Sequence, residues 1–276
     1  MAAYTAIKYE KRGHTACITL NRPEKLNSIN YAMIDELAVA YKAVEDDPDV
    51  WTLIVTGAGD RALCTGADVS TMPDPKSGAS KPGQDSRGEA FLSKMWQWDA
   101  PQEATPPYLQ MTKPVICAVN GMAAGAGLDL ITTSDIAIAA DTATFFDPHV
   151  SIGIVSGREM VRLARVIPLN AAMRVALLGK QERMSAQRAY ELGLITEIVP
   201  QARLMDRAWE LAELVNKNAP LAVRGTRLGI RKGLSLPVYE AELLAESHRL
   251  RVAASEDALE GPRAFMEKRA PNWKAR

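Results

Sequence analysis

The chain has 276 residues, 47% of them hydrophobic and 24% charged, a composition typical of a globular protein that buries a sizeable core. Basic and acidic residues number 33 each, so the formal net charge is zero and no overall positive field would attract nucleic acid or an anionic membrane. The apolar stretches are far shorter than a membrane helix, and the first residues lack the pattern of a secretion signal. We therefore expect a cytoplasmic protein whose partners include neither nucleic acid nor a membrane.

The cysteines and histidines, three of each, lack the spacing of a metal site. An odd number of cysteines in a chain without a secretion signal indicates reduced thiols. We expect no metal ion.

The first elements form a predicted hairpin followed by a helix. Residues 7–10 and 16–20 have strand-like composition and flank the turn Arg12-Gly13. From Asn30 onward, apolar residues recur with helical spacing up to the sequence Asp-Asp-Pro at 46–48, which is expected to end the helix.

Three further apolar runs, at 51–56, 114–119 and 135–139, predict buried strands. A predicted helix at 128–133 lies between the last two, and such a succession is typical of parallel βαβ units. Residues 70–112 are rich in proline, serine and glycine and are predicted to form a long loop with a helical middle at 88–98.

From Arg158 onward the chain is predicted to be almost entirely helical. Ser185 and Gly193 are suitable caps for a helix between them, and 196–199 is a late strand. Helices are expected from 205 to 269, and the change to all-α near residue 200 is the one candidate boundary between subdomains.

The sequence GAGDRA at 57–62 follows a predicted strand and fits the loose G-x-G-x-x-G/A pattern of dinucleotide-binding folds. The residues after it do not continue a helix, and no acidic residue stands about 20 positions further on to bind a ribose. A plain loop is therefore favoured over the nucleotide site of a dehydrogenase.

Two other small-residue turns follow strands, LCTGADV at 63–69 and NGMAAGAGLD at 120–129. Small side chains let a ligand approach the backbone, and a turn that opens a helix offers unpaired N–H groups at the positive end of the helix dipole. Two such N–H groups directed at one point would form an oxyanion hole. Each turn taken alone favours a simpler explanation, which is close packing of helix on sheet.

Together and in this order, the two turns resemble the enoyl-CoA hydratase (crotonase) family. The first is similar to the family's loop ending in Gly-Ala-Asp-aliphatic, and the second to its strand, Val-Asn-Gly, glycine cluster and acidic residue. The sequence NRPEKLN at 21–27 resembles the family's early Arg-Pro turn, and EGPRAFMEKR at 260–269 resembles its C-terminal helix. The resemblance covers nearly the whole chain.

The resemblance implies an α/β fold, with a crotonase-like ββα spiral core that holds the oxyanion hole at 1–200 and a C-terminal helical trimerisation region at 201–276. Members of the family bind acyl-CoA thioesters and assemble as trimers or dimers of trimers, so we expect a homotrimer or a homohexamer. No separate cofactor is implied, because coenzyme A is carried by the substrate.

By position, the resemblance assigns the two oxyanion donors to the amides of Ala67 and Ala126. The two proton-transfer carboxylates of the hydratases fall at Asp129, which is shorter than the usual Glu, and at His149, where the family commonly has Glu. Histidine exchanges protons near neutral pH, so it is a chemically sensible replacement. The alternatives are a carboxylate that only stabilises a helix start, for Asp129, and a structural or surface histidine, for His149.

Two neighbouring positions bear on these roles. If the stretch 146–150 is extended, Asp147 and His149 lie on the same side and can form a pair. Arg158 and Glu159 stand where the family often has two glycines, and a surface ion pair between them is favoured over a replacement carboxylate at Glu159.

For coenzyme A, the family uses the early turn and the backbone after the first oxyanion donor. This implies contacts with Lys25, Leu26, Ala67, Asp68 and Val69. Phe265 and Lys268 on the C-terminal helix are further implied contacts. The region 71–107 is similar to the family's variable loop over the acyl pocket, and a core or interface role is favoured over substrate contact for its Met95, Trp96 and Trp98.

The resemblance thus implies a lyase that acts on acyl-CoA thioesters. The leading hypothesis is an enoyl-CoA hydratase, as in fatty acid metabolism, which adds water reversibly to a 2-enoyl-CoA through an enolate. Isomerase, hydrolase or decarboxylase chemistry on the same fold is an alternative because of His149, and so is a non-catalytic CoA-binding protein.

Overall fold

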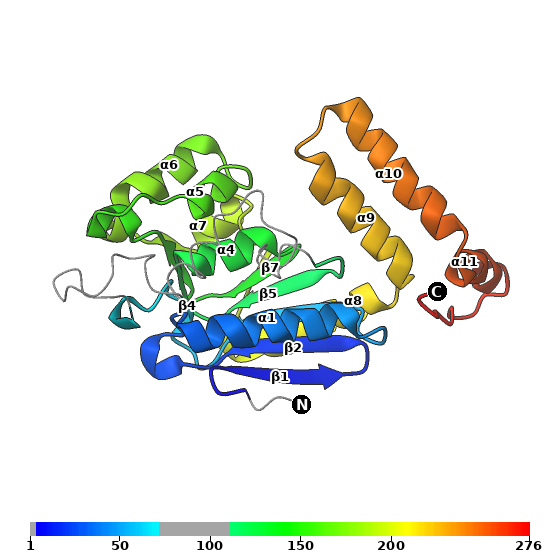
Figure 1. The fold of residues 1–276 in the computed structure, drawn as a ribbon, viewed down its shortest axis with the longest axis horizontal. Helices are drawn as coiled ribbons and strands as arrows, with labels where there is room; N and C mark the ends of the chain where they lie inside the picture. The colour runs from blue at the N-terminus through cyan, green and yellow to red at the C-terminus, as the bar shows by residue number, and fades with distance from the viewer. Residues whose placement is uncertain (1–3, 72–110) are drawn as a thin grey trace.

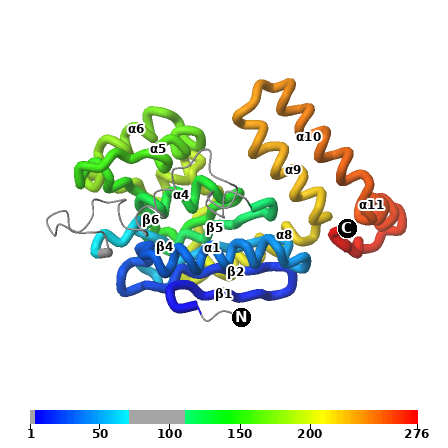
Figure 2. Tube along the Cα trace, in the orientation of Figure 1, coloured from blue at the N-terminus to red at the C-terminus, as the bar shows by residue number. Residues whose placement is uncertain are grey.

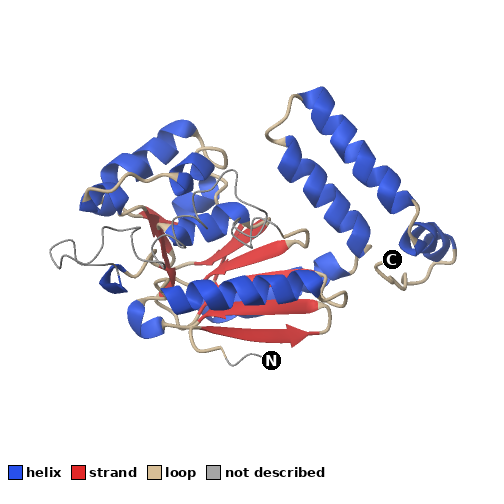
Figure 3. Ribbon diagram, in the orientation of Figure 1, coloured by secondary structure: helices blue, strands red, loops and turns tan. Residues whose placement is uncertain are grey.

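The computed structural model describes residues 4–71 and 111–276, which form two sheets, flanking helices and a helical arm (Figure 1 and Figure 3). The larger sheet has six strands, in the spatial order β1 (Ile7–Arg12), β2 (Thr15–Leu20), β3 (Thr52–Gly57), β5 (Val115–Val119), β7 (Ile136–Ala140) and β10 (Glu197–Val199). The pair β1–β2 is antiparallel and every other neighbouring pair is parallel, as the strand-helix-strand pattern predicted.

The predicted hairpin and first helix are confirmed. The hairpin turns at Gly13, whose φ of +52° lies in the left-handed region that glycine tolerates. The helix α1 (Tyr31–Asp46) begins after Asn30, whose side chain accepts a hydrogen bond from the amide of Met33 at 2.9 Å.

Both faces of the larger sheet are buried, which explains the continuous apolar runs in the sequence. Side chains along a strand alternate between the two faces. Leu53 and Val55 of β3 pack in the same cluster as the buried residues of α1, whereas Ile54 packs with the apolar face of α8 (Leu204–Asn216) on the opposite side.

The helix α8, which lies beyond the expected boundary at residue 200, therefore packs on the core, and that boundary stays a prediction. Its residues Leu204, Ala208 and Ala212 are buried against Ile116 of β5 and Ile138 of β7, so a cut at 200 would expose that face of the sheet. The all-α character of the C-terminal part is confirmed.

A second, four-stranded sheet was not predicted. Its strands are β4 (Ala62–Cys64), β6 (Met122–Ala124), β8 (Thr144–Phe146) and β9 (Met184–Ser185), in that spatial order. Each has only two or three residues, too few for an alternating apolar pattern to be recognised. This sheet positions the site, because β4 and β6 pair in parallel and carry the two small-residue turns at their ends.

Four short helices lie beside the second sheet, namely α4 (Ala126–Thr133), α5 (Arg158–Leu163), α6 (Leu169–Leu178) and α7 (Ala186–Glu191). The predicted caps of α7 are confirmed: the Ser185 side chain accepts from the amide of Arg188 at 3.2 Å, and Gly193 has a φ of +80°.

The arm consists of α9 (Pro220–Gly233), α10 (Val238–Ala253) and α11 (Glu256–Met266), and it extends to one side of the core (Figure 2). Gly225, Gly229 and Gly233 recur every four residues on the face of α9 that packs on α10, and a Cβ added at Gly229 would lie 3.2 Å from that of Ala245. Across 4–71 and 111–276, no helix is long and apolar enough to cross a membrane.

Candidate active site

Two buried asparagines fix the loop between β3 and β4. The side-chain amide of Asn27 donates to the carbonyl of Ala62 at 2.7 Å, and that of Asn120 donates to the same carbonyl at 3.0 Å. The Oδ1 atom of Asn120 also accepts from the amide of Gly57 at 3.1 Å. The glycine-rich sequence 57–62 is thus a loop held by side chains that leads into β4, as the sequence favoured. The structural role of the two asparagines was not predicted.

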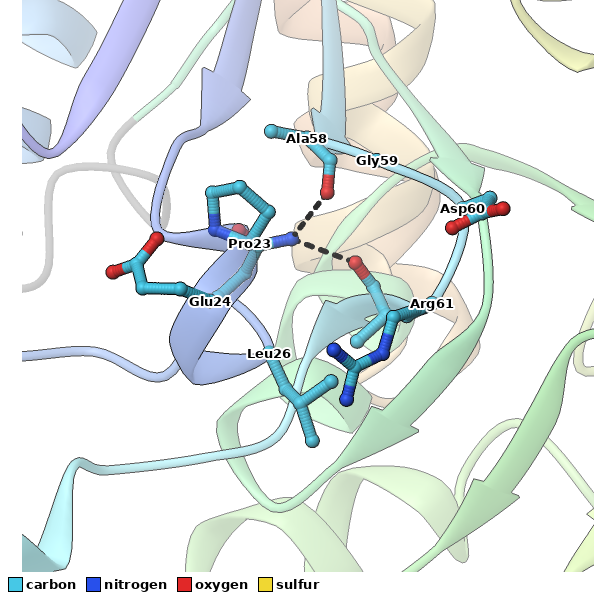
Figure 4. Close-up of a pocket in the computed structure, with 9 residues that line it drawn as sticks. Pro23, Glu24, Leu26, Ala58, Gly59, Asp60 and Arg61 are labelled. Atoms are coloured by element: carbon cyan, nitrogen blue, oxygen red, sulfur yellow. Dashed lines mark hydrogen bonds between the residues drawn. The ribbon is translucent and has the colours of Figure 1, made fainter.

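A pocket of about 260 Å³ lies between this loop and the early turn. Figure 4 shows Glu24 and Leu26 on one side and the segment from Ala58 to Arg61 on the other. The side-chain amide of Asn27 also donates to the carbonyl of Ala58 at 3.0 Å. Leu26, an implied contact of coenzyme A, lines this pocket. The neighbouring Lys25 is exposed on the 3₁₀ turn Pro23–Lys25.

The two small-residue turns, which the sequence places about 60 residues apart, are in direct contact. Gly66 has a φ of +95°, and a Cβ added to it would lie 3.6 Å from the carbonyl oxygen of Ala124 and 3.9 Å from the amide nitrogen of Ala126. Gly127 packs even closer, because an added Cβ would lie 2.3 Å from the carbonyl oxygen of Cys64. Close packing and an oxyanion hole are therefore compatible, since packing is what brings the turns together.

The amides of Ala67 and Ala126 are available to a ligand. Ile29 bonds to both neighbours of Ala67, donating to the carbonyl of Gly66 and accepting from the amide of Asp68 at 2.9 Å each, so the amide of Ala67 points away from it. Ala126 is the first residue of α4, where an N–H has no partner within the helix. Among the described residues, neither amide donates a hydrogen bond to another group.

The pairing of Asp147 with His149 is confirmed. The ring nitrogen Nδ1 of His149 lies 2.7 Å from Oδ1 of Asp147, whose side chain is fully buried. The segment is not extended as the prediction assumed: Asp147 follows β8, and His149 begins the 3₁₀ turn His149–Ile152. The hydrogen bond with Asp147 raises the pKa of His149, with a smaller contribution from Glu159, and burial opposes them.

His149 also lies beside the second turn. A Cβ added at Gly125 would lie 3.4 Å from Cε1 of the imidazole ring. Gly125 directly precedes Ala126, and its φ of +52° is one that side-chain-bearing residues rarely adopt. The imidazole is therefore adjacent to one of the two candidate oxyanion donors.

Asp129 is buried in the first turn of α4, where the sequence placed it, but its carboxylate is engaged by two arginines. Oδ2 lies 3.0 Å from Arg158, and Oδ1 lies 2.7 Å from Arg162. The ion pair of Arg158 is thus with Asp129, so the predicted surface pair with Glu159 is wrong. The proton-transfer role of Asp129 stays a prediction, although this geometry favours a role in positioning.

The other implied CoA contacts fall into two groups. Asp68 and Val69 directly follow Ala67, and the Asp68 carboxylate lies 2.7 Å from Arg22. Hydrogen bonds from the Ser70 hydroxyl and then from the Arg22 guanidinium lower the pKa of Asp68. Phe265 and Lys268 lie at the end of the arm, which Figure 1 shows well apart from α4. Within one chain, these two residues are therefore not brought to the site.

The predictions for Met95, Trp96 and Trp98 and for a helix at 88–98 lie outside the described residues. The three cysteines, by contrast, are all described, and Cys17, Cys64 and Cys117 are buried and free.

Comparison with known proteins agrees with the fold. The family model of enoyl-CoA hydratase/isomerase matches residues 10–276. Enoyl-CoA hydratase EchA19 of Mycobacterium tuberculosis is 35% identical over 271 residues, 97% of this chain and 96% of the relative. An (E)-benzylidenesuccinyl-CoA hydratase of Thauera aromatica is 32% identical over 271 residues, 97% of this chain and 98% of that protein. The crystal structure of an enoyl-CoA hydratase/isomerase from Mycobacterium paratuberculosis has a TM-score of 0.85 and 58% identity, covering 99% of this chain and all of that one, which confirms the crotonase-like fold.

Proposed function

Because this chain belongs to the enoyl-CoA hydratase/isomerase family, we propose that it adds water reversibly to the double bond of a 2-enoyl-CoA thioester. The observation that carries the proposal is the contact of the two turns, which leaves the amides of Ala67 and Ala126 unbonded at adjoining positions. Two amide donors at the thioester oxygen stabilise the negative charge that develops there in the transition state.

The chemistry follows from that charge. The oxygen of water bonds to C3, the electrons of the C2–C3 double bond move toward C1, and the thioester oxygen becomes an enolate oxygen held by the two amides. The proton released by water goes to a base, and C2 then takes a proton as the thioester carbonyl forms again. His149 lies beside the Ala126 turn, and histidine is the residue type best suited to exchange protons near neutral pH, so we assign it this proton transfer.

The early turn, residues 21–27, is where we place coenzyme A. The pocket beside Leu26 and the exposed Lys25 lie next to the loop that leads to Ala67, which supports CoA contacts at Lys25, Leu26, Asp68 and Val69. Phe265 is 85% exposed at the end of the arm. Phe265 and Lys268 can therefore complete the site only of a neighbouring subunit, in a cytoplasmic homotrimer or dimer of trimers.

The replacement Ala126→Pro tests the proposal. Proline is favoured at the first position of a helix, so α4 should form, but the amide donor is lost and the ring occupies its place. We expect hydration of crotonyl-CoA, or of longer or aromatic enoyl-CoAs, to fall by about 10²-fold or more. Loss of the enoyl absorbance and the appearance of 3-hydroxyacyl-CoA measure the rate.

A matched control is Leu169→Pro, which places proline at the exposed first position of α6 after Pro168. It should leave the rate close to that of the unmodified enzyme. If no enoyl-CoA is hydrated by the intact oligomer, or if both proline variants are equally active, the proposed function is wrong.

A further inference from the structure

We propose that Asp147 is a positioning residue that holds the imidazole of His149 with its proton on Nδ1, so that Nε2 is the proton acceptor beside the oxyanion turn. The inference deepens the proposed function and rests on it for its catalytic meaning. The hydrogen-bond geometry of the pair, however, can be tested without any substrate.

The donor in this pair is fixed by chemistry. An ionised carboxylate oxygen only accepts hydrogen bonds, so at 2.7 Å from Oδ1 of Asp147 the Nδ1 atom of His149 must carry the hydrogen. In a neutral imidazole the other nitrogen, Nε2, then has the lone pair. Within 4–71 and 111–276, Nε2 has no hydrogen-bond partner, so it is available to water or substrate.

The burial of Asp147 makes His149 its main source of stabilisation. The Asp147 side chain has no exposed surface, and its second oxygen, Oδ2, is buried without a hydrogen-bond partner among the described residues. A buried carboxylate with one partner is stabilised chiefly by that partner. Asp147 therefore favours the protonated form of His149, and the shift is toward a higher pKa.

Other charged groups near the His149 imidazole come from α4 and α5. Glu159 of α5 also raises the pKa of His149. Arg158, next to it, is bonded to Asp129 of α4, and the positive end of α4 lies at Gly125 against the imidazole ring. Among the described residues, Asp147 is the only group hydrogen-bonded to the ring, and its effect on the pKa is the largest.

Asp129 is bound differently from Asp147. Each of its carboxylate oxygens is paired with a guanidinium group, Oδ2 with Arg158 and Oδ1 with Arg162. The residue to which the resemblance assigns the first proton-transfer carboxylate thus holds Arg158 and Arg162 against α4. One histidine and its buried partner can shuttle the proton of water from the attacking oxygen to C2.

The tautomer can be measured on the full-length protein with nitrogen-15-labelled histidine. Only His14, His149 and His248 contribute signals, and the variant His149→Gln identifies the one of interest. Above its pKa, the imidazole of His149 should show a protonated Nδ1 and an unprotonated Nε2, and its titration midpoint should lie above 6.5. A neutral ring protonated at Nε2 would overturn the proposal.

The replacement Asp147→Asn tests the consequence for catalysis. The amide has no charge and can donate to Nδ1, which allows the opposite tautomer, so kcat should fall by about 10²-fold or more while KM changes little. The acid limb of the profile of kcat/KM against pH should move to lower pH, because neutral His149 is the active form and its pKa falls. A residue with a purely structural role would not shift this limb.

The control is Asp141→Asn, an exposed aspartate after β7, which should change neither the rate nor the profile. If Asp147→Asn lowers activity without moving the acid limb, or leaves the tautomer unchanged, Asp147 does not position His149. If the unmodified enzyme hydrates no enoyl-CoA but shows the expected tautomer, the proposed function fails and the hydrogen-bond geometry stands.

Discussion

Gly127 is the residue at which the two turns approach most closely, because an added Cβ would lie 2.3 Å from a backbone carbonyl oxygen of Cys64. Backbone cannot give way as a flexible side chain does. We expect Gly127→Ala to lower the free energy of unfolding by about 1–3 kcal/mol and to reduce kcat by separating the donors. Chemical denaturation and the hydration assay measure the two effects.

Gly261→Ala is the matched control, since the added methyl in α11 would lie 3.3 Å from the end of the Trp273 side chain and meet no backbone. The helix gains from alanine there, so the change in stability should stay within about 1 kcal/mol. Equal losses in both variants would contradict a special role for Gly127.

For single residues, the sequence predicts local backbone features such as turns and helix caps. It does not predict which side chains from distant elements will pair. The two turns could be singled out because small residues after strands mark sites of close backbone approach, and the resemblance to the family assigned the donors to Ala67 and Ala126. The engagement of Asp129 by Arg158 and Arg162 could not, because the partners lie on different helices and their pairing depends on how α4 and α5 pack.

One carboxylate binds two arginines at the junction between arm and core. Asp135, just before β7, lies 2.6 Å from Arg227 and 2.9 Å from Arg231, both on α9, and these side chains are largely buried. Asp135→Asn should destabilise the attachment of α9 by about 1–3 kcal/mol, since hydrogen bonds to charged groups contribute on this scale. Hydrogen exchange should then accelerate in α9 and α10 but not in β3 or β5.

Glu246→Gln is the comparison, because it removes an exposed ion pair with Arg249 within α10 and should leave these exchange rates unchanged. Faster exchange throughout the core after Asp135→Asn would show that the arm and the core unfold as one unit, contrary to this account.

Elements with a long, periodic pattern were predictable, and short ones were not. The hairpin, α1 and the buried parallel strands follow from apolar spacing and caps, whereas β4, β6, β8 and β9 are too short to carry a pattern. The boundary expected at 200 stays a prediction, because an amphipathic helix such as α8 has the same pattern whether it covers a core sheet or belongs to an arm.

The whole molecule exposes apolar surface that a single chain does not cover. The helix α10 has no buried residue, although several of its residues are large and apolar. Tyr239, Leu243 and Leu250 are 68%, 53% and 60% exposed. Apolar patches of this kind mark interaction sites. We expect light scattering to give a mass of three or six times the 30.0 kDa of the chain.

Leu243→Lys should shift that assembly toward monomers and lower activity, because it places a charge in the proposed interface. Val39→Lys on α1, where valine is 54% exposed, is the control and should leave the mass unchanged. A monomeric unmodified protein that hydrates enoyl-CoA at full rate would contradict the proposed assembly. Sequence indicated the assembly only through resemblance, because the pattern of one chain does not show which exposed faces meet.

The most direct test of the oxyanion hole is a crystal structure of the enzyme with a bound 3-hydroxyacyl-CoA. We predict that the thioester oxygen lies within about 2.7–3.1 Å of the amide nitrogens of both Ala67 and Ala126, and that Nε2 of His149 faces C2. A thioester oxygen bound elsewhere, or in contact with neither amide, would contradict it.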